Sequence, residues 1–474
     1  MVDGTVSLVL LLSTLVVFVV VGLRAARRGG DVEDYLIARG SQPALTLGLS
    51  FLAAGMGAWI LFAPPEVGAG VGALGLAGYA VGAAVPIALF AVLGPRLRAV
   101  VPDGHSLTEF ARLRFGRGFH VYLGAVSVAY MLCFVTAELT AAGGVTAILS
   151  GLDPRITVIA VAVATLAYTV LGGLRASLRT DRFQAWLILA LLAVGSVAVL
   201  QGVDDPASAW AAAGRPAFDR LGAEVAATLI IAVTVANLLH RGYWQRVWAA
   251  RDARALRRGA ALGAAATVPV VLLVGAAGIL AAGSGRDLGT PPVPFFALLT
   301  GLPSWVGLLV LVLAAALVAS SVDTLETGLA SLVAAERPGT SLAGARLVTV
   351  LLMVPAVAVA LQGYSVLRLF LIADVLCAGA VGPALLGLWR RATPAGALAG
   401  AVAGLAGAVV PGWVTSGSVA TGVWMATFPG AVPTLPPFAG ALVASLVVGV
   451  GVSVAGRTQT DLSALAGRVP SLGR

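Results

Sequence analysis

The run VSLVLLLSTLVVFVVVGL, residues 6–23, decides the fold class of this 474-residue chain. It has 18 residues and no charge, and about 20 apolar residues let an α-helix cross the hydrocarbon core of a bilayer. Asp3 precedes the run, and Arg24, Arg27 and Arg28 follow it. A cleaved signal peptide carries its positive charge before the apolar run. The sequence therefore predicts an uncleaved membrane-spanning helix with its N-terminus outside.

The rest of the chain has the same apolar character. Hydrophobic residues make up 59% of it and charged residues only 11%, whereas soluble domains contain about 25% charged residues. A soluble fold of this size could not bury so much apolar surface, but helices that face lipid need not bury it. The pattern predicts an all-α polytopic membrane protein with about 13 spans. After the first, the expected spans are 43–63, 70–94, 118–150, 155–172, 183–201, 222–241, 259–282, 304–333, 344–362, 366–389, 394–412 and 436–455.

The basic residues, all of them arginine, support this arrangement of spans. Counted from an outside N-terminus, 25 of the 30 fall in alternate loops and in the C-terminal tail. Cytoplasmic loops carry an excess of positive charge, so the C-terminus is expected in the cytoplasm. A composition with no lysine and much alanine and glycine is typical of a GC-rich bacterial genome, which predicts a bacterial inner (plasma) membrane. The five exceptions are Arg155, Arg215, Arg220, Arg286 and Arg368.

The sequence offers no constellation of catalytic residues. A chain without lysine cannot form a P-loop or a Schiff-base site. His105, His120 and His240 lie in or near expected cytoplasmic loops, without the cysteines or carboxylates of a metal site. The GVGALG pattern at 70–75 lacks a preceding strand, so close helix packing explains its glycines better than a nucleotide site. No enzymatic activity, no nucleic-acid partner and no metal beyond a transported ion are expected.

Acidic residues inside the apolar spans are candidates for function. A charge at the centre of a spanning helix costs about 2.5–3.5 kcal/mol on insertion scales. The alternative is that each carboxylate lies at a hydrated span end or only makes hydrogen bonds. The residues concerned are Glu66, Glu138, Asp323, Glu326 and Asp374.

The segment ASSVDTLET, residues 319–327, carries a polar stripe within an apolar span. Hydroxyl residues recur there at spacings i, i+4, i+7 and i+11, which places them on one face of a helix. Hydroxyl and carboxylate oxygens on one face suit a hard cation such as Na⁺, but serine and threonine also join neighbouring helices as a polar seam. Both interpretations stay open at this point. The stripe consists of Ser320, Thr324, Thr327 and Ser331, with Ser321 and Asp323 beside it.

A second unusual span, residues 48–59, is crowded with small residues and is followed by the sequence APPE at 63–66. Glycine and proline weaken a helix there, and backbone carbonyls that lose their partners must then line a cavity or an ion site. The alternative is a tightly packed helix with a proline at its end.

Five short stretches, taken in their order along the chain, form a further set of motifs. They are 48–59, GGLRA at 172–176 running into TDRFQ at 180–184, WQRVWAAR at 244–251, the serine pair at 320–321 with its stripe, and GLWRRATPAGA at 387–397.

In this order the five stretches resemble the sodium/solute symporter family, which includes sodium–proline, sodium–sugar, sodium–sialic acid and pantothenate carriers. The resemblance implies a LeuT-type core of two inverted repeats of five helices each. The expected regions are 1–42, with the first helix and a loop, 43–203 and 220–391, with the two repeats, and 392–474, with two more helices and the tail.

The resemblance also implies a sodium site between the first and eighth core helices. Asp181 matches a family aspartate that is linked to sodium passage at the cytoplasmic side. Sodium–proline carriers have an aspartate where this chain has Gly55, and this difference bears on the affinity for sodium. By position, the implied ligands are the backbone carbonyls of Ala53, Met56 and Leu317 and the hydroxyls of Ser320 and Ser321.

The expected function is sodium-coupled symport of a small polar organic solute into the cell by alternating access. The spans contain acids but no clear mid-membrane arginine, which disfavours a multiply anionic solute. A neutral, zwitterionic or cationic solute, such as an amino acid or a urea-like compound, fits better, although a helix N-terminus can hold one carboxylate. The expected solute residues, each with simple packing as its alternative, are Gly57, Trp59, Glu138, Asn237 and Asp374.

Two other functions compete with this one. The first is proton-coupled symport, in which Glu138 or Asp374 titrates. The second is a transporter-like sensor, which would need a signalling domain, whereas only about 20 residues follow Val454. The expected partners are the lipid bilayer and the small solute, and the chain is expected to function as a monomer.

Overall fold

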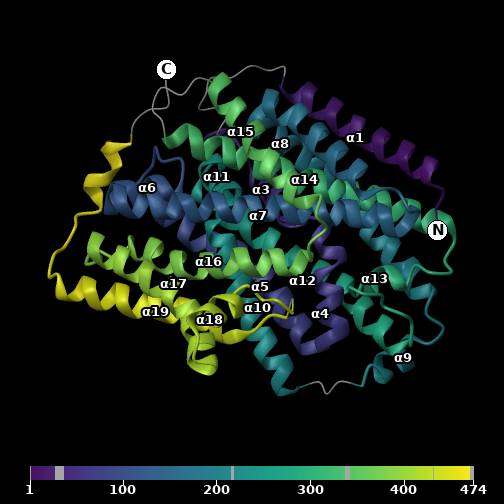
Figure 1. Cartoon of the computed structure of the whole chain (residues 1–474). Helices are drawn as coiled ribbons and strands as arrows, with labels where there is room; N and C mark the ends of the chain where they lie inside the picture. Colours follow the sequence, from purple (N-terminus) through teal and green to yellow (C-terminus); the bar gives the residue numbers. More distant parts are fainter. Residues whose placement is uncertain (1, 27–36, 215–217, 337–341, 431, 470–474) are drawn as a thin grey trace.

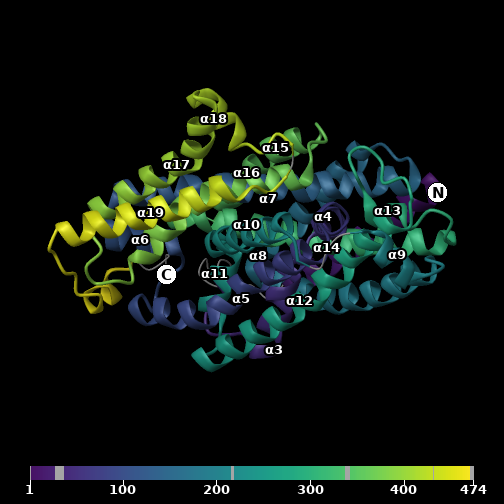
Figure 2. The same ribbon diagram turned by 90° about the horizontal axis from the view of Figure 1, so that it is seen from below.

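In the structure, a computed structural model, 82% of the described residues are helical. In Figure 1 the long helices α7, α16, α17 and α19 run side by side across the molecule, with α1 at the opposite edge. Figure 2 shows the α17–α19 pair lying next to α16 and away from α3 and α12. The structure describes residues 2–26, 37–214, 218–336, 342–430 and 432–469.

The helices follow one another along the described parts of the chain. They are α1 (Gly4–Ala26), α3 (Ala44–Gly55), η1 (Ala58–Leu61), α4 (Ala63–Val71), α5 (Ala73–Val100), α6 (Leu107–Phe115), α7 (Arg117–Ser150), α8 (Pro154–Gln201), α9 (Pro206–Ala212), α10 (Arg220–Leu239), α11 (Arg241–Ala249), α12 (Ala253–Gly283), α13 (Pro294–Ala297), α14 (Ser304–Glu336), α15 (Leu342–Ala360), α16 (Val366–Leu386), α17 (Pro394–Ser416), α18 (Val419–Met425), α19 (Leu435–Ala455) and η2 (Ser463–Arg468).

The helices reproduce the spans expected from hydropathy. Within the described residues, 11 helices are long and apolar enough to cross a membrane, and the bent pair Ala44–Gly55 and Ala58–Val71 makes a twelfth candidate. A shorter apolar helix, Arg346–Ala360, corresponds to the expected span 344–362. The prediction of an all-α polytopic membrane protein is confirmed. The orientation of the termini and the bounds of the two repeats stay predictions.

Helix α8 contains two of the expected spans, which meet at Gly173. The backbone there has φ 55° and ψ −152°, outside the helical region. A positive φ of this kind is easily adopted only by glycine. The apolar stretches Pro154–Leu171 and Ala176–Gln201 on either side each meet the length of a span, so one glycine separates two membrane crossings.

Helix α14 is the most enclosed of the candidate spans, with 78% of its apolar window buried. It packs against α7 and α8, and also against α3 and η1. A helix that touches protein on nearly all sides can carry polar groups at membrane depth, because neighbouring helices supply their partners. This position explains how the polar stripe of residues 319–331 is accommodated.

Small residues set the spacing between several helices, and Gly278 of α12 is one of the closest cases. A Cβ added there would lie 1.9 Å from the carbonyl oxygen of Pro65 in α4. Because this neighbour is backbone, it cannot rotate away. We expect Gly278→Ala to destabilise the protein by about 1–3 kcal/mol through overpacking.

Thermal unfolding of the purified protein in detergent measures this effect. The matched control is Gly70→Ala in α4, where an added Cβ meets nothing within 4 Å. Equal melting temperatures for Gly278→Ala and Gly70→Ala would contradict the close approach of α12 and α4.

Candidate functional site

The first core helix is broken where the sequence is richest in small residues. Helix α3 ends at Gly55, and the backbone is extended at Met56 (φ −100°, ψ 96°) and Gly57 (φ −101°, ψ −177°). The next helical segment begins at Ala58, and the pair is bent by 59°. The helix is therefore interrupted where glycine and proline were expected to weaken it. Carbonyl groups at the end of α3 lose the partners that a continuous helix would supply.

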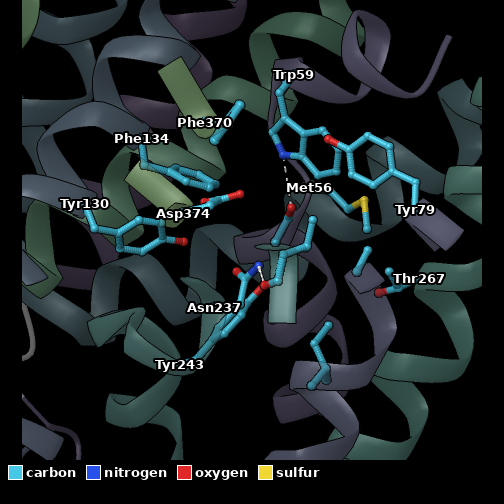
Figure 3. Close-up of a pocket in the computed structure, with 14 residues that line it drawn as sticks. Met56, Trp59, Tyr79, Tyr130, Phe134, Asn237, Tyr243, Thr267, Phe370 and Asp374 are labelled. Carbon is cyan, nitrogen blue, oxygen red and sulfur yellow. Dashed lines mark hydrogen bonds between the residues drawn. The ribbon is translucent and has the colours of Figure 1, made fainter. Parts of the chain in front are cut away.

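A cavity of ≈ 40 Å³ adjoins this break, with Gly55, Met56 and Trp59 in its wall. This volume holds one to a few water molecules. Asp374 of α16 is the one charged side chain among the residues that line it. Figure 3 shows Asp374 at the centre of the site, with Tyr130 on one side and Trp59 on the other.

Aromatic rings supply six of the 14 residues that line the cavity. Trp59 stacks on Tyr79 at 5.5 Å between ring centroids, and Phe134 meets Phe370 edge-on at 4.8 Å. The faces of aromatic rings carry negative potential and attract cations. The rings and the Asp374 carboxylate therefore favour the same kind of ligand group, a positively charged one.

The structure divides the five expected solute residues into two groups. Trp59, Asn237 and Asp374 line the cavity. Gly57 and Glu138 lie against each other beside it, because Glu138 Oε2 accepts a hydrogen bond of 2.7 Å from the Ala58 backbone N–H. A Cβ on Gly57 would lie only 1.8 Å from Oε1 of Glu138. The roles of all five stay predictions.

Sequence reasoning missed most of the aromatic wall. Trp59 was singled out because it lies in the middle of a span, and the same signal was present for Tyr79, Tyr130 and Phe134. The additional residues that line the cavity with aromatic or hydroxyl groups are Tyr79, Tyr130, Phe134, Tyr243, Thr267 and Phe370.

The expected sodium ligands lie where α14 packs against α3. Ser320 and Ser321 are fully buried. The Ser320 hydroxyl donates a 2.8 Å hydrogen bond to Oδ1 of Asp181, and the Ser50 hydroxyl donates one of 2.6 Å to Oδ2. Asp181, expected on the sodium release path, is therefore in direct contact with Ser320. The residues expected to supply backbone ligands, Ala53, Met56 and Leu317, are buried as well.

Arg246 of α11 lies in the interior and not in a cytoplasmic loop, where its charge had suggested it. Its guanidinium forms a 2.6 Å ion pair with Asp181, and neither side chain is exposed. It also donates hydrogen bonds to the hydroxyls of Ser50 and Thr324, at 2.8 and 3.2 Å. An arginine next to hydrophobic residues on a short helix cannot be distinguished by sequence from a loop residue.

Two other acidic residues of α14 are held by hydroxyl groups of α8. Asp323 accepts hydrogen bonds from Tyr168 and Ser177, both at 2.8 Å. Glu326 accepts them from Thr165 and Thr169, at 2.9 and 2.6 Å. This face of α14 forms a polar seam with α8. The role of Ser320 and Ser321 as sodium ligands stays a prediction.

A larger cavity of ≈ 440 Å³ lies at the end of the break opposite to α3, lined by Phe62, Glu66 and Arg155. The connections that follow α12 and α15 contribute Pro291 and Tyr364. These connections are expected outside the cell, so this cavity is the candidate entrance to the site.

Comparison with known proteins agrees with this arrangement. A family model described as the sodium:solute symporter family matches residues 35–333. The chain belongs to this family. It is a transporter and not an enzyme.

Curated relatives of this symporter include fungal transporters. The spermidine transporter DUR31 of Candida albicans is 31% identical over 374 residues, which cover 77% of this chain and 72% of the relative. The urea active transporter of Saccharomyces cerevisiae is 25% identical over 198 residues, or 38% of this chain and 27% of the relative.

Solved structures show the same fold. A Na⁺-coupled sialic acid symporter in a substrate-bound outward-open state matches with a TM-score of 0.75 at 15% identity, covering 96% of this chain and 98% of that one. The inward-facing form of Mhp1 matches with a TM-score of 0.56 at 15% identity, covering 92% and 98%. At these identities the likeness shows the fold alone, and the predicted LeuT-type fold is confirmed.

The symporter differs from sodium–proline carriers at Gly55, and the structure gives a steric reason. A Cβ at this position would lie 2.3 Å from the hydroxyl oxygen of Tyr243. The space that an aspartate would need is thus occupied by the tyrosine of α11. Tyr243 also packs edge-on against Phe51 of α3 at 5.6 Å, which ties α11 to the end of α3.

Proposed function

We propose that this symporter imports a small organic cation, such as an amine, together with sodium by alternating access. The observation that carries this proposal is the aromatic cavity with Asp374 as its one charged residue. Repeats at 43–203 and 220–391 would move relative to each other around this site in the plasma membrane of a bacterium.

The charge of the cavity favours a cationic solute over an anionic one. An anion would face the Asp374 carboxylate with no lining arginine to balance it. An ammonium group would pair with the carboxylate and contact the faces of Trp59 and Tyr79. The likeness to a spermidine transporter points to the same class of solute. Because the cavity measures only ≈ 40 Å³, the walls must separate to admit an organic molecule, as alternating access requires.

The coupling to sodium is supported by the oxygen atoms at the helix break. Backbone carbonyls at the end of α3 and the hydroxyls of Ser320 and Ser321 suit a hard cation. Asp181, in contact with Ser320, would receive the ion on its way to the cytoplasm. An inside-negative potential supplies about 2.3 kcal/mol per 100 mV for each positive charge carried inward, which can support a large solute gradient.

The double variant Ser320→Ala with Ser321→Ala tests the sodium site. We expect the sodium concentration for half-maximal uptake of labelled spermidine into proteoliposomes to rise at least about tenfold, which corresponds to about 1.4 kcal/mol. The control is Ser445→Ala in α19, a buried serine whose hydroxyl bonds only within its own helix.

Two results would contradict the proposal. Unchanged sodium dependence in the double variant would refute the site. Wild-type uptake that is driven by a pH gradient and is unaffected by removing sodium would show proton coupling instead, with Glu138 or Asp374 as the titrating group.

A further inference from the structure

Glu138 occupies a junction between three helices that the proposed function does not yet use. It comes from the middle of α7 and is fully buried. Its Oε2 accepts the hydrogen bond from the Ala58 N–H, at the start of η1. Ala58 is the residue before Trp59, which lines the solute cavity. The carboxylate thus binds the backbone of the helix break next to the solute cavity.

The Glu138 carboxyl group also lies near Ser321, one of the expected sodium ligands. The Ser321 hydroxyl of α14 is near enough to interact with the Glu138 carboxyl. Even so, neither Oε1 of Glu138 nor Oγ of Ser321 has a hydrogen-bond partner in the described part of the chain. Buried polar atoms are nearly always satisfied, so two converging oxygens without partners are typical of ligands for a third group.

The chemistry of these atoms selects a small cation. A carboxylate oxygen and a hydroxyl oxygen are both hard ligands, which suit sodium. The one arginine of this region, Arg246, is already paired with Asp181. A solute amine is a poorer candidate, because Glu138 does not belong to the wall of the solute cavity. Serine hydroxyls and backbone carbonyls alone would leave a buried sodium ion without any counter-charge, and burying an unpaired charge is costly.

We propose that Glu138 is a ligand of the coupling sodium ion, which it shares with Ser321, and that it transmits binding of this ion to the solute site through Ala58. This inference rests on the proposed sodium coupling. With one oxygen on the ion and the other on the Ala58 amide, the carboxylate fixes the backbone that carries Trp59. Sodium binding would then order the solute cavity before the solute arrives, which is the differential interaction that coupling requires.

Gly57 supports this role by its lack of a side chain. A Cβ there would lie 1.8 Å from Oε1 and 2.2 Å from Oε2 of Glu138. Any larger residue at position 57 would displace the Glu138 carboxylate, although Glu138 itself would still be present. Gly57→Ala is therefore a second way to remove the ligand.

Sodium binding by purified protein in detergent tests the proposal. Melting temperatures are measured over a series of NaCl concentrations, with choline chloride keeping the ionic strength constant. We expect Glu138→Gln to raise the half-saturating sodium concentration at least about tenfold, which corresponds to about 1.4 kcal/mol. The spermidine affinity measured at saturating sodium should stay within about twofold of the wild-type value, a change of less than about 0.5 kcal/mol.

The matched control is Glu326→Gln, another fully buried glutamate. Its carboxylate is held by Thr165 and Thr169, so the sodium response should stay that of the wild type. If Glu138→Gln does not fold, Gly57→Ala decides, and the same rise in half-saturating sodium is expected.

The outcomes separate this inference from the function on which it rests. If Glu138→Gln responds to sodium as the wild type does, the role of Glu138 is overturned but the sodium coupling is not. Where Glu138→Gln does not fold, a wild-type response of Gly57→Ala has the same consequence. A variant that loses spermidine affinity at saturating sodium but keeps its sodium response makes Glu138 a solute residue and also overturns it. A wild-type protein that sodium does not stabilise overturns the sodium coupling as well.

Discussion

Arg246→Ala is expected to destabilise the folded symporter by about 3–5 kcal/mol, because it leaves a buried carboxylate without its counter-charge. The partner is Asp181, at 2.6 Å, and neither side chain is exposed. The variant also removes the donor that holds Ser50. Unfolding of the purified protein in detergent, followed by its intrinsic fluorescence, measures the change in free energy.

Arg251→Ala is the matched control for this prediction. Arg251 lies in the same arginine-rich stretch and also faces an acid, Asp252, at 3.4 Å, but its side chain is 66% exposed. Exposed ion pairs contribute about 0–1 kcal/mol, so this variant should unfold nearly as the wild type does. A similar small effect for Arg246→Ala would show that the ion pair is not buried in the folded protein.

A neutral pair separates stability from transport. Replacing both partners, Asp181→Asn with Arg246→Gln, leaves no isolated charge in the interior. We expect this double variant to recover most of the stability lost in Arg246→Ala, because the cost lies mainly in the uncompensated carboxylate. Sodium-driven uptake by the double variant should stay below that of the wild type, since Asp181 is the proposed acceptor of the ion released from Ser320.

Asp374→Asn is expected to weaken binding of a cationic solute at least about 30-fold, or about 2 kcal/mol, the lower end of the loss when one partner of a buried charge pair is removed. Asparagine keeps the shape of the side chain and removes the charge on which the aromatic cavity depends. The measurement is the concentration of unlabelled spermidine that half-inhibits uptake of a labelled amine in proteoliposomes.

Thr267→Val is the control for the cavity itself. Thr267 lines the same cavity, and its hydroxyl is bonded within its own helix to the Gly263 carbonyl. It should therefore change solute affinity only slightly. The proposal of a cationic solute would be contradicted if the half-inhibiting concentration of spermidine were the same in Asp374→Asn and in the wild type. It would also be contradicted if carboxylates, and not amines, stabilised the wild-type protein.

The membrane architecture could be predicted because its causes are local. Each span must satisfy its own backbone hydrogen bonds in lipid, so an apolar run such as residues 6–23 already specifies a helix. The break after Gly55 was predictable for the same reason, since small residues and the prolines that follow weaken a helix without help from distant parts of the chain. Even Ser320, in a polar stripe of an apolar span, and Ser321 beside that stripe were visible.

The sequence by itself thus determined the class of fold, the weak point of the first core helix and the polar stripe of α14. Tertiary structure alone decided which charges are neutralised and which side chains meet. Arg246 lies 65 residues from Asp181 along the chain, and nothing local distinguishes it from the loop arginines nearby. The cavity gathers Trp59, Asp374 and their neighbours from distant helices. A pair of groups that far apart has no periodic signal, because its energy depends on distance in space and on the loss of water around it.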